Sequence, residues 1–178
     1  MPRSSRRQSL HLRAVAFALK LNSAGAQQYN LAFGGDGTDG INGIAVDSAG
    51  NAYIVGYTES SNLDTTNAAD SSRGGTSDGF LAKLGTTGAT ILYSTYIGSS
   101  QTDTALAVAL DASGKVYVVG TTHVTGSTSF TTTSGAMQTT AANSTAAGYL
   151  QVYDLSLSGA ATLVYSTYIS GSGSDNTP

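Results

Sequence analysis

The chain repeats part of its own sequence, and this repetition constrains the fold more than any other feature. Residues 45–58 (AVDSAGNAYIVGYT) align with residues 109–122 (ALDASGKVYVVGTT) at an offset of 64 residues, counted from 45 to 109. Farther along the chain, residues 92–97 (LYSTYI) recur as residues 164–169 (VYSTYI). Repeats of this kind are supersecondary units that bury their apolar faces by stacking on their neighbours.

The N-terminal region has two interpretations, a signal peptide or a further copy of the repeat. Residues 5–10 (SRRQSL) are loosely similar to a twin-arginine motif, and residues 14–19 (AVAFAL) are apolar. However, residues 17–21 (FALKL) align with residues 80–84 (FLAKL), and Lys20, which interrupts the apolar run, falls opposite a lysine. We therefore expect two strands of a repeat before residue 34 rather than a signal peptide.

Each repeat divides into four expected strands. In the first complete copy they cover residues 44–46, 52–55, 80–84 and 91–97, and the second copy begins with strands at 107–110 and 116–119. Asp47, with a glycine three residues later, predicts a tight turn between the first two strands. A long loop rich in Ser and Thr separates the second strand from the third. Four antiparallel strands at this period predict blades of the β-propeller type.

The predicted fold is therefore all-β, with four-stranded antiparallel blades of the β-propeller type in an open array rather than a closed propeller. We count about two and a half blades, whereas closed propellers typically have four to eight. The expected organisation is a basic, disordered tail at 1–13 and a propeller segment at 14–178, divided into a half blade (14–40), two blades (41–98 and 105–169) and a connector (170–178). Open blade edges favour self-association.

Composition and charge exclude several classes of partner. The net charge is -3, and most of the eight basic residues lie before residue 21, so the body of the chain is acidic. A nucleic-acid surface needs a basic stripe across the fold, and this sequence has none. No apolar run approaches the roughly 20 residues that span a bilayer. We expect no nucleic-acid partner and no membrane span.

One short motif suggests a metal. Residues 34–41 (GGDGTDGI) match the calcium-binding nonapeptide GGxGxDxU, where U is a large apolar residue. The motif offers Asp36 and Asp39 as ligands, and Asp103 and Asp175 occupy the position of Asp39 in later copies. Tandem nonapeptides share the oxygens that calcium needs, but these copies are too far apart along the chain to share them. The favoured interpretation is an aspartate that caps backbone N–H groups at a turn, with no cofactor.

The sequence gives little support to any arrangement of catalytic residues. His11 and His123 form no zinc-binding pair, and no G-x-S-x-G motif accompanies the serines. Glu59 is the single glutamate, so no pair of carboxylates stands out as acid and base. Asp47 and Asp111 lie at equivalent turn positions, where turn-stabilising hydrogen bonds explain them more simply than a cation does. We predict that the chain is not an enzyme; a propeller lyase or glycosidase is the least favoured alternative.

The sequence resembles the seven-bladed beta-propeller (SBBP) repeat family of bacteria. The resemblance rests on residues 45–58, 80–84 (FLAKL), 93–98 (YSTYIG) and 130–138 (FTTTSGAMQ), and it covers roughly residues 14–175. It implies propeller-type blades within an exported or cell-surface bacterial protein. The family has no shared catalytic residues, so none is transferred to this chain.

These observations predict a non-enzymatic structural or binding module, with a calcium-stabilised repeat protein as the alternative. If the module binds a protein or a glycan, the long loops at 59–78 and 123–147 are the expected surface, because loops on a rigid β scaffold commonly carry recognition. The candidate contact residues on these loops are Phe130, Met137 and Asp64. For Phe130 and Met137 the alternative is that they pack the loop onto the sheet.

Overall fold

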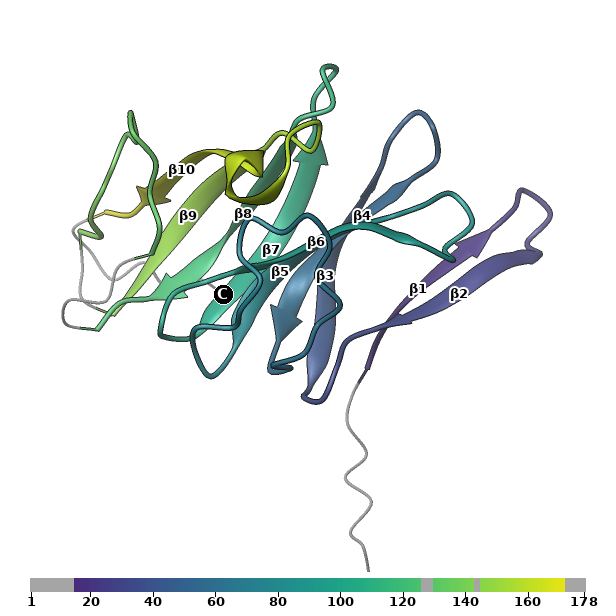
Figure 1. Cartoon of the computed structure of the whole chain (residues 1–178), viewed down its shortest axis with the longest axis horizontal. Helices are drawn as coiled ribbons and strands as arrows, with labels where there is room; N and C mark the ends of the chain where they lie inside the picture. The colour runs from purple at the N-terminus through teal and green to yellow at the C-terminus, as the bar shows by residue number, and fades with distance from the viewer. Residues whose placement is uncertain (1–14, 126–129, 143–144, 172–178) are drawn as a thin grey trace, which may run out of the picture.

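The fold consists almost entirely of β-strands. The computed structural model describes residues 15–125, 130–142 and 145–171 (Figure 1). Within these ranges the elements are β1 (Ala16–Leu21), β2 (Gln27–Phe33), β3 (Asp39–Val46), β4 (Ala52–Thr58), β5 (Asp78–Leu84), β6 (Ile91–Ile97), β7 (Asp103–Leu110), β8 (Val116–His123), β9 (Ala146–Tyr153), a 3-10 helix η1 (Gly159–Thr162) and β10 (Leu163–Ile169). The all-β prediction is confirmed.

The strands form three antiparallel sheets that follow one another along the molecule (Figure 1). We call β1–β2 the half blade, β3–β6 the first blade and β7–β10 the second blade. In each blade the strands pair in chain order, and no sheet in the described part of the chain closes into a barrel. The predicted open array is thus confirmed. No helix in the described ranges is long and apolar enough to cross a membrane.

The half blade has the structure that the repeat alignment predicts for the N-terminal region. β1 pairs with β2 from Ala16 opposite Phe33 to Leu21 opposite Gln27, so the apolar stretch forms a hairpin. The tail predicted at 1–13 and most of the connector at 170–178 lie outside the described residues, and the proposed boundaries between blades remain predictions.

The first strand of each blade begins earlier than predicted. β3 starts at Asp39 and β7 at Asp103, although apolar alternation indicates strands only from 44 and 107. The reason is a register shift in each strand, between Ile41 and Gly43 in β3 and at the equivalent place in β7. An irregularity of this kind interrupts the alternation of side chains between the two faces of the sheet. The apolar pattern is therefore recognisable only after the irregularity, although the strand begins before it.

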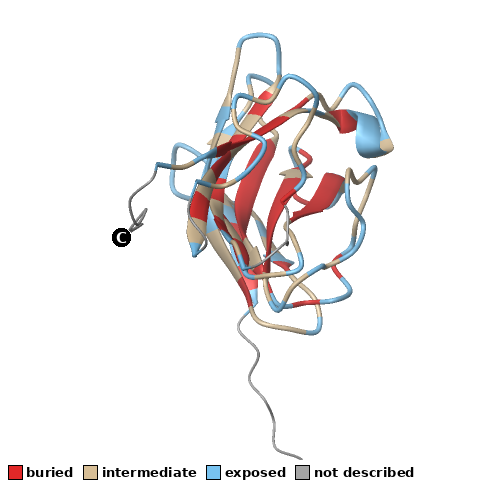
Figure 2. Cartoon of the chain, turned by 90° about the vertical axis from the view of Figure 1, so that its left-hand side faces the viewer, coloured by how far each residue is buried: buried red, intermediate tan, exposed pale blue. Residues whose placement is uncertain are grey.

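Two apolar cores lie between the sheets, where the buried residues concentrate (Figure 2). The core between the first and second blades includes Val55 and Leu81 on one side and Val118 and Tyr149 on the other. The other core, between the half blade and the first blade, contains Ala18, Phe33, Ile54, Phe80 and Leu84. Each face of the first blade therefore packs against a different neighbour.

The first strands of adjacent blades approach each other closely. A Cβ atom on Gly43 of β3 would lie 3.3 Å from both the Cα of Ala107 and the carbonyl oxygen of Leu106 on β7. The side-chain amide of Asn42 donates a hydrogen bond of 2.9 Å to the carbonyl of Ala105. A small residue at Gly43 thus lets the two backbones come together, and Asn42 fixes their relative position.

Gly56 of β4 lies opposite the irregular part of β3, and we predict that Gly56→Ala is strongly destabilising. A Cβ atom there would overlap the carbonyl oxygen of Gly40, which is backbone and cannot rotate away. The expected loss is about 3 kcal/mol of unfolding free energy, measured by denaturant unfolding. Gly85→Ala is the matched control, because its Cβ would make only ordinary contacts, the nearest at 3.5 Å. Equal stability of the two variants would contradict this prediction.

Candidate functional site

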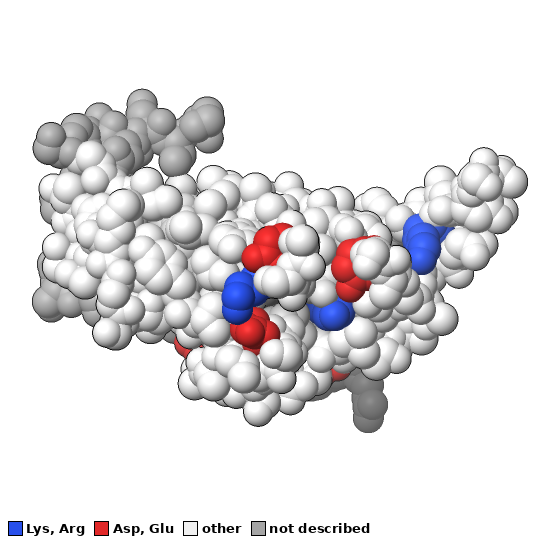
Figure 3. Space-filling model, turned by 90° about the horizontal axis from the view of Figure 1, so that it is seen from above, with Lys and Arg blue, Asp and Glu red and all other residues white. Residues whose placement is uncertain are grey.

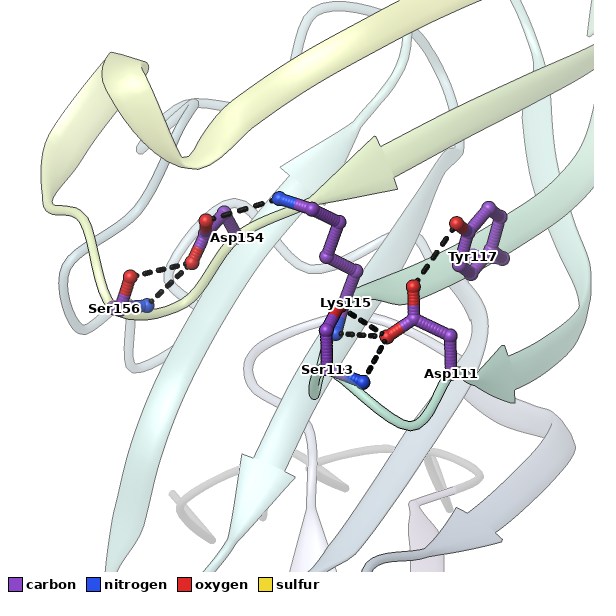
Figure 4. Close-up of polar contacts among 6 residues, drawn as sticks. All are labelled: Asp111, Ser113, Lys115, Tyr117, Asp154 and Ser156. Carbon is purple, nitrogen blue, oxygen red and sulfur yellow. Dashed lines mark hydrogen bonds and ion pairs between the residues drawn. The ribbon is translucent and has the colours of Figure 1, made fainter.

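Asp47 and Asp111 each organise the turn between the first two strands of a blade. Oδ1 of Asp111 accepts hydrogen bonds from the backbone N–H groups of Ser113 and Lys115, at 2.9 Å each, while Oδ2 accepts the Tyr117 hydroxyl at 3.1 Å (Figure 4). Asp47 accepts the equivalent bonds in the first blade. The predicted turn-stabilising role of both aspartates is confirmed by these hydrogen bonds.

A groove runs between these two turns, and charged side chains line it. Its volume is about 920 Å³ and charged side chains of both signs gather around it (Figure 3). The side chains that define it are Asp47, Lys83, Asp111, Lys115 and Asp154. The groove can therefore offer hydrogen-bond donors and acceptors side by side.

Both lysines of the groove are paired with carboxylates of the groove. Lys115 contacts Oδ2 of Asp154 at 3.1 Å (Figure 4), whereas Lys83 lies 3.8 Å from Oδ2 of Asp47 and 5.0 Å from the centre of the Tyr53 ring. The side-chain hydroxyl of Ser156, followed by Lys115, lowers the pKa of Asp154 to about 2. This carboxylate is thus ionised at neutral pH, and its contact with Lys115 is the shorter of the two ion pairs.

Asp39 and Asp103 lie buried at the start of the first strand of each blade. Oδ2 of Asp39 accepts hydrogen bonds from the Gly35 N–H at 3.0 Å and the Ser60 hydroxyl at 2.8 Å, and Oδ1 accepts the Thr58 hydroxyl. The bond from the Gly35 N–H is of the kind that the turn-capping interpretation predicts, and the two bonds from hydroxyl groups come in addition to it. The sequence comparison placed Asp39 in the connector before the strand; it instead begins β3, because it pairs with Thr58 on β4.

Asp103 is less completely bonded than Asp39. Its Oδ2 accepts the Ser99 N–H and hydroxyl, but its buried Oδ1 has no hydrogen-bond partner among the described residues. In the first blade the Thr58 hydroxyl donates to Oδ1 of Asp39, whereas the hydroxyl of its counterpart Thr122 donates to the carbonyl of His123 at 3.4 Å. Burial raises the pKa of Asp103.

A third buried carboxylate, Asp78, lies next to Asp103. A Cβ atom on Gly98 would touch both, 2.6 Å from Cγ of Asp78 and 3.0 Å from Oδ2 of Asp103. Burial raises the pKa of Asp78 to about 6, the negative charge of Asp103 adds to this effect, and N–H donors from Gly74 and Gly75 oppose it. Two carboxylates this close favour the state in which one of them holds a proton.

The structure does not assemble the predicted calcium ligands into one cluster. Asp36 is exposed and accepts bonds from the N–H and hydroxyl of Ser61, and Asp175 lies outside the described residues. Among the residues that the structure describes, no group of three or more His, Cys, Asp or Glu side chains could hold a metal ion. Calcium at Asp36, Asp39 and Asp103 remains a prediction.

The long loops fold back onto the outermost strand of each blade. The hydroxyl of Tyr96 on β6 donates to the carbonyl of Ser60 at 3.0 Å and accepts the N–H of Leu63 at 2.9 Å. In the second blade the hydroxyl of Tyr168 accepts the N–H of Phe130 at 2.7 Å. The repeated tyrosine thus holds the loop in both copies.

The threonine before each tyrosine adds a second attachment. Oγ1 of Thr95 exchanges hydrogen bonds with both backbone groups of Asp70, and Oγ1 of Thr167 does the same with Gln138. In the first blade, Ser94 and the loop residue Thr66 also form a backbone bridge. The loops thus cover the outer edges of β6 and β10, which would otherwise be open to strand pairing.

The three candidate contact residues on the loops have different environments. Phe130 is buried, with its ring stacked on Tyr149 at a centroid distance of 4.4 Å, so it packs the loop onto the sheet. Met137 is 73% exposed and Asp64 is also exposed. Only Met137 and Asp64 are therefore placed where they could meet a partner directly.

Two parts of this arrangement were not identified from the sequence. Asp78 has Ala147 as its counterpart, since both pair with the equivalent threonine of the neighbouring strand, so a search for repeated residues passes over it. The groove joins the first two turns to Asp154, which follows the third strand of the second blade. The spacing of Gly74 and Gly75 before Asp78 was the available signal, because it is typical of a capping aspartate.

We predict that protonation of Asp78 stabilises the protein. Because its folded pKa of about 6 lies above the unfolded value, this contribution is complete below about pH 4 and is lost as the pH rises through about 6. After allowance for solvent screening the effect is on the order of 1–2 kcal/mol. Asp78→Asn should therefore reduce the fall in unfolding free energy between these pH values, as measured by denaturant titration.

The matched control is Asp64→Asn, which removes an exposed carboxylate. Asp111 and Asp154 do not contribute to the slope in this pH window, because their hydrogen-bonded carboxylates have lowered pKa values and lose stability only at lower pH. A pH dependence that Asp78→Asn and Asp64→Asn leave equally unchanged would contradict the assignment.

Comparison with known proteins agrees with the repeat architecture. Residues 27–64 match the family described as beta-propeller repeat (SBBP). This segment runs from β2 through β3 and β4 into the first long loop, so it includes Asp39 at the junction between blades and the Asp47 turn. No curated protein matches the chain. Residues 27–64 are thus similar to one beta-propeller repeat (SBBP), and the array of blades extends on either side of this segment.

Proposed function

We propose that this chain is a non-enzymatic structural module, a run of stacked blades within an exported or cell-surface bacterial protein. The beta-propeller repeat family is consistent with a module that stacks and presents surfaces. The exported location rests on the family resemblance alone.

One observation supports the proposal above all others. The polar residues that recur in both blades are used to hold the blades together. The turn aspartates bind their own backbone, and the tyrosine and threonine of each outer strand bind the loops. A catalytic group must instead be free to contact a substrate. The repeated positions of this chain therefore support architecture rather than chemistry.

A binding role for the same module is supported by the surfaces that the repeats leave free. Met137 and Asp64 are exposed on loops that the outer strands hold in place, which is a suitable arrangement for recognition of a protein. The groove between the turns, with Lys83 and Lys115 on its walls, offers donors for the hydroxyl groups of a glycan. Self-association through open blade edges is the third form of binding that we propose.

The test of the structural proposal is a panel of glycan substrates incubated with the full chain. We expect no turnover, and we expect Asp47→Asn and Asp111→Asn to lower the melting temperature because each removes an acceptor from a turn. Turnover that disappears in either variant, while the variant remains folded by circular dichroism, would instead assign the turns to an active site. Met137→Ser serves as the control for a neutral change at an exposed position.

The calcium-stabilised alternative has one observation in its favour, the unpartnered buried Oδ1 of Asp103 beside Asp78. An ion that binds only the folded state raises the melting temperature. Under the structural proposal, the melting temperature in millimolar calcium equals that in chelator. A rise with calcium that is lost in Asp103→Asn and kept in Asp64→Asn would replace the structural proposal with the alternative.

A further inference from the structure

Part of the first blade carries apolar side chains that face water. Ile44 is 57% exposed and Val46 is 61% exposed, although their cross-strand neighbours Ile54 and Ala52 are buried in the core next to the half blade. Directly opposed residues of paired strands lie on the same face of a sheet. Ile44 and Val46 therefore extend this buried face toward the first strand of the blade, where nothing in the described structure covers it.

The repeat shows what such a position looks like when it is covered. Val108 and Leu110 are the counterparts of Ile44 and Val46 on β7, and both are half-buried against the core that the first blade helps to form. β7 is contacted chiefly by β3 and β4, the first two strands of the preceding blade, and to a smaller extent by β5. For the first blade, the preceding unit is the half blade, and it has only the counterparts of β5 and β6.

The half blade also has a free edge at the corresponding place. β1 pairs only with β2 in the described structure, whereas its counterpart β5 lies between β4 and β6. An unpaired edge presents a row of backbone N–H and C=O groups that accept an additional strand. β1 contacts β3, so this edge and the exposed face of the first blade adjoin each other.

Lys20 adds charge to the same place. Its counterpart Lys83 faces the Asp47 carboxylate and the Tyr53 ring, both of which belong to the hairpin formed by β3 and β4. Lys20 has no such hairpin in its own sheet; it reaches the carbonyl oxygens of Gly50 and Thr86 on the first blade at 3.4 and 3.2 Å and lies 5.9 Å from the centre of the Tyr29 ring. Its ammonium group is therefore suitably placed to bind a hairpin with an aspartate at its turn.

We propose that the half blade is a docking site for a β-hairpin of the type that β3 and β4 form, supplied by another chain. The second strand of the guest pairs antiparallel with β1, and its first strand covers Ile44 and Val46. The turn aspartate of the guest binds Lys20, and the tyrosine six residues after it packs beneath the lysine, as Tyr53 does beneath Lys83. The register of β4 on β5, with Tyr53 opposite Lys83, sets the register of the guest on β1.

This inference rests on the proposed function as a stack of blades, but its test is independent. The guest probe is a synthetic peptide of residues 39–58, labelled at one end, and the receptor is the full chain. We expect saturable binding by fluorescence anisotropy with a dissociation constant on the order of 10 μM. Hydrogen exchange should slow at the amides of β1 when the peptide is bound.

Matched variants distinguish docking at the proposed site from nonspecific binding of the peptide elsewhere on the chain. Ile44→Glu and Val46→Glu place a charge where the guest packs, and they should weaken binding roughly tenfold or more. Met137→Glu changes an exposed apolar residue on the second blade in the same way and should leave binding unaltered. In the peptide, replacement of Asp47 by Asn should weaken binding to the unaltered chain. The same replacement should leave binding to the Lys20→Ala variant unchanged, because the partner of the aspartate is then absent. The substitution is in the peptide, so it does not affect the folding of the receptor.

Three results would overturn the inference. They are the absence of saturable binding up to about 1 mM peptide, equal binding to Ile44→Glu and Met137→Glu, and slowed exchange at β6 or β10 in place of β1. The chain could also associate with itself, and Phe17→Glu could abolish this association while Ile44→Glu leaves it intact. That result would overturn the inference, because it would assign the half blade to stacking between copies of the chain. None of these results affects turnover or calcium dependence, so the structural proposal can survive the loss of this one.

Discussion

Each blade of this fold has two apolar faces, and each face gains stability in water when a neighbouring blade covers it. The first blade has a neighbour on both faces: Phe80 and Ile54 are buried against the half blade, while Leu81 and Val55 are buried against the second blade. The half blade and the second blade each have one face covered. Stacking therefore determines which residues are buried, and a blade by itself does not.

The polar residues of each blade satisfy a second requirement, that the outer edge of the sheet be covered. Tyr96 and Thr95 hold the first long loop along β6, and Tyr168 and Thr167 hold the second loop along β10. Edge protection by a loop of the same blade leaves the faces free for stacking. This division of labour explains why the motif Tyr-Ser-Thr-Tyr recurs while the loops between its copies differ in sequence.

Repetition in the sequence was sufficient to predict the number of sheets, their strand order and the turn role of Asp47 and Asp111. It was not sufficient for features that only one copy possesses. Asp78 escaped notice because the second blade has Ala147 in its place, and its raised pKa depends on its burial beside Asp103. The start of β3 was missed because a register irregularity separates its first residues from the alternating apolar residues that follow.

The exposed residues at the two ends follow from the same constraint. Phe17 is 68% exposed although its counterpart Phe80 is fully buried, and Val119 is 40% exposed although Val55 is fully buried. The two residues of each pair are of the same type and occupy the same position in the repeat, so local sequence cannot account for the difference in their exposure. The presence or absence of a neighbouring sheet in the described structure does account for it. Apolar patches of this kind mark interaction surfaces. The exposed faces of the half blade and the second blade are therefore the described surfaces that a neighbour would cover most readily.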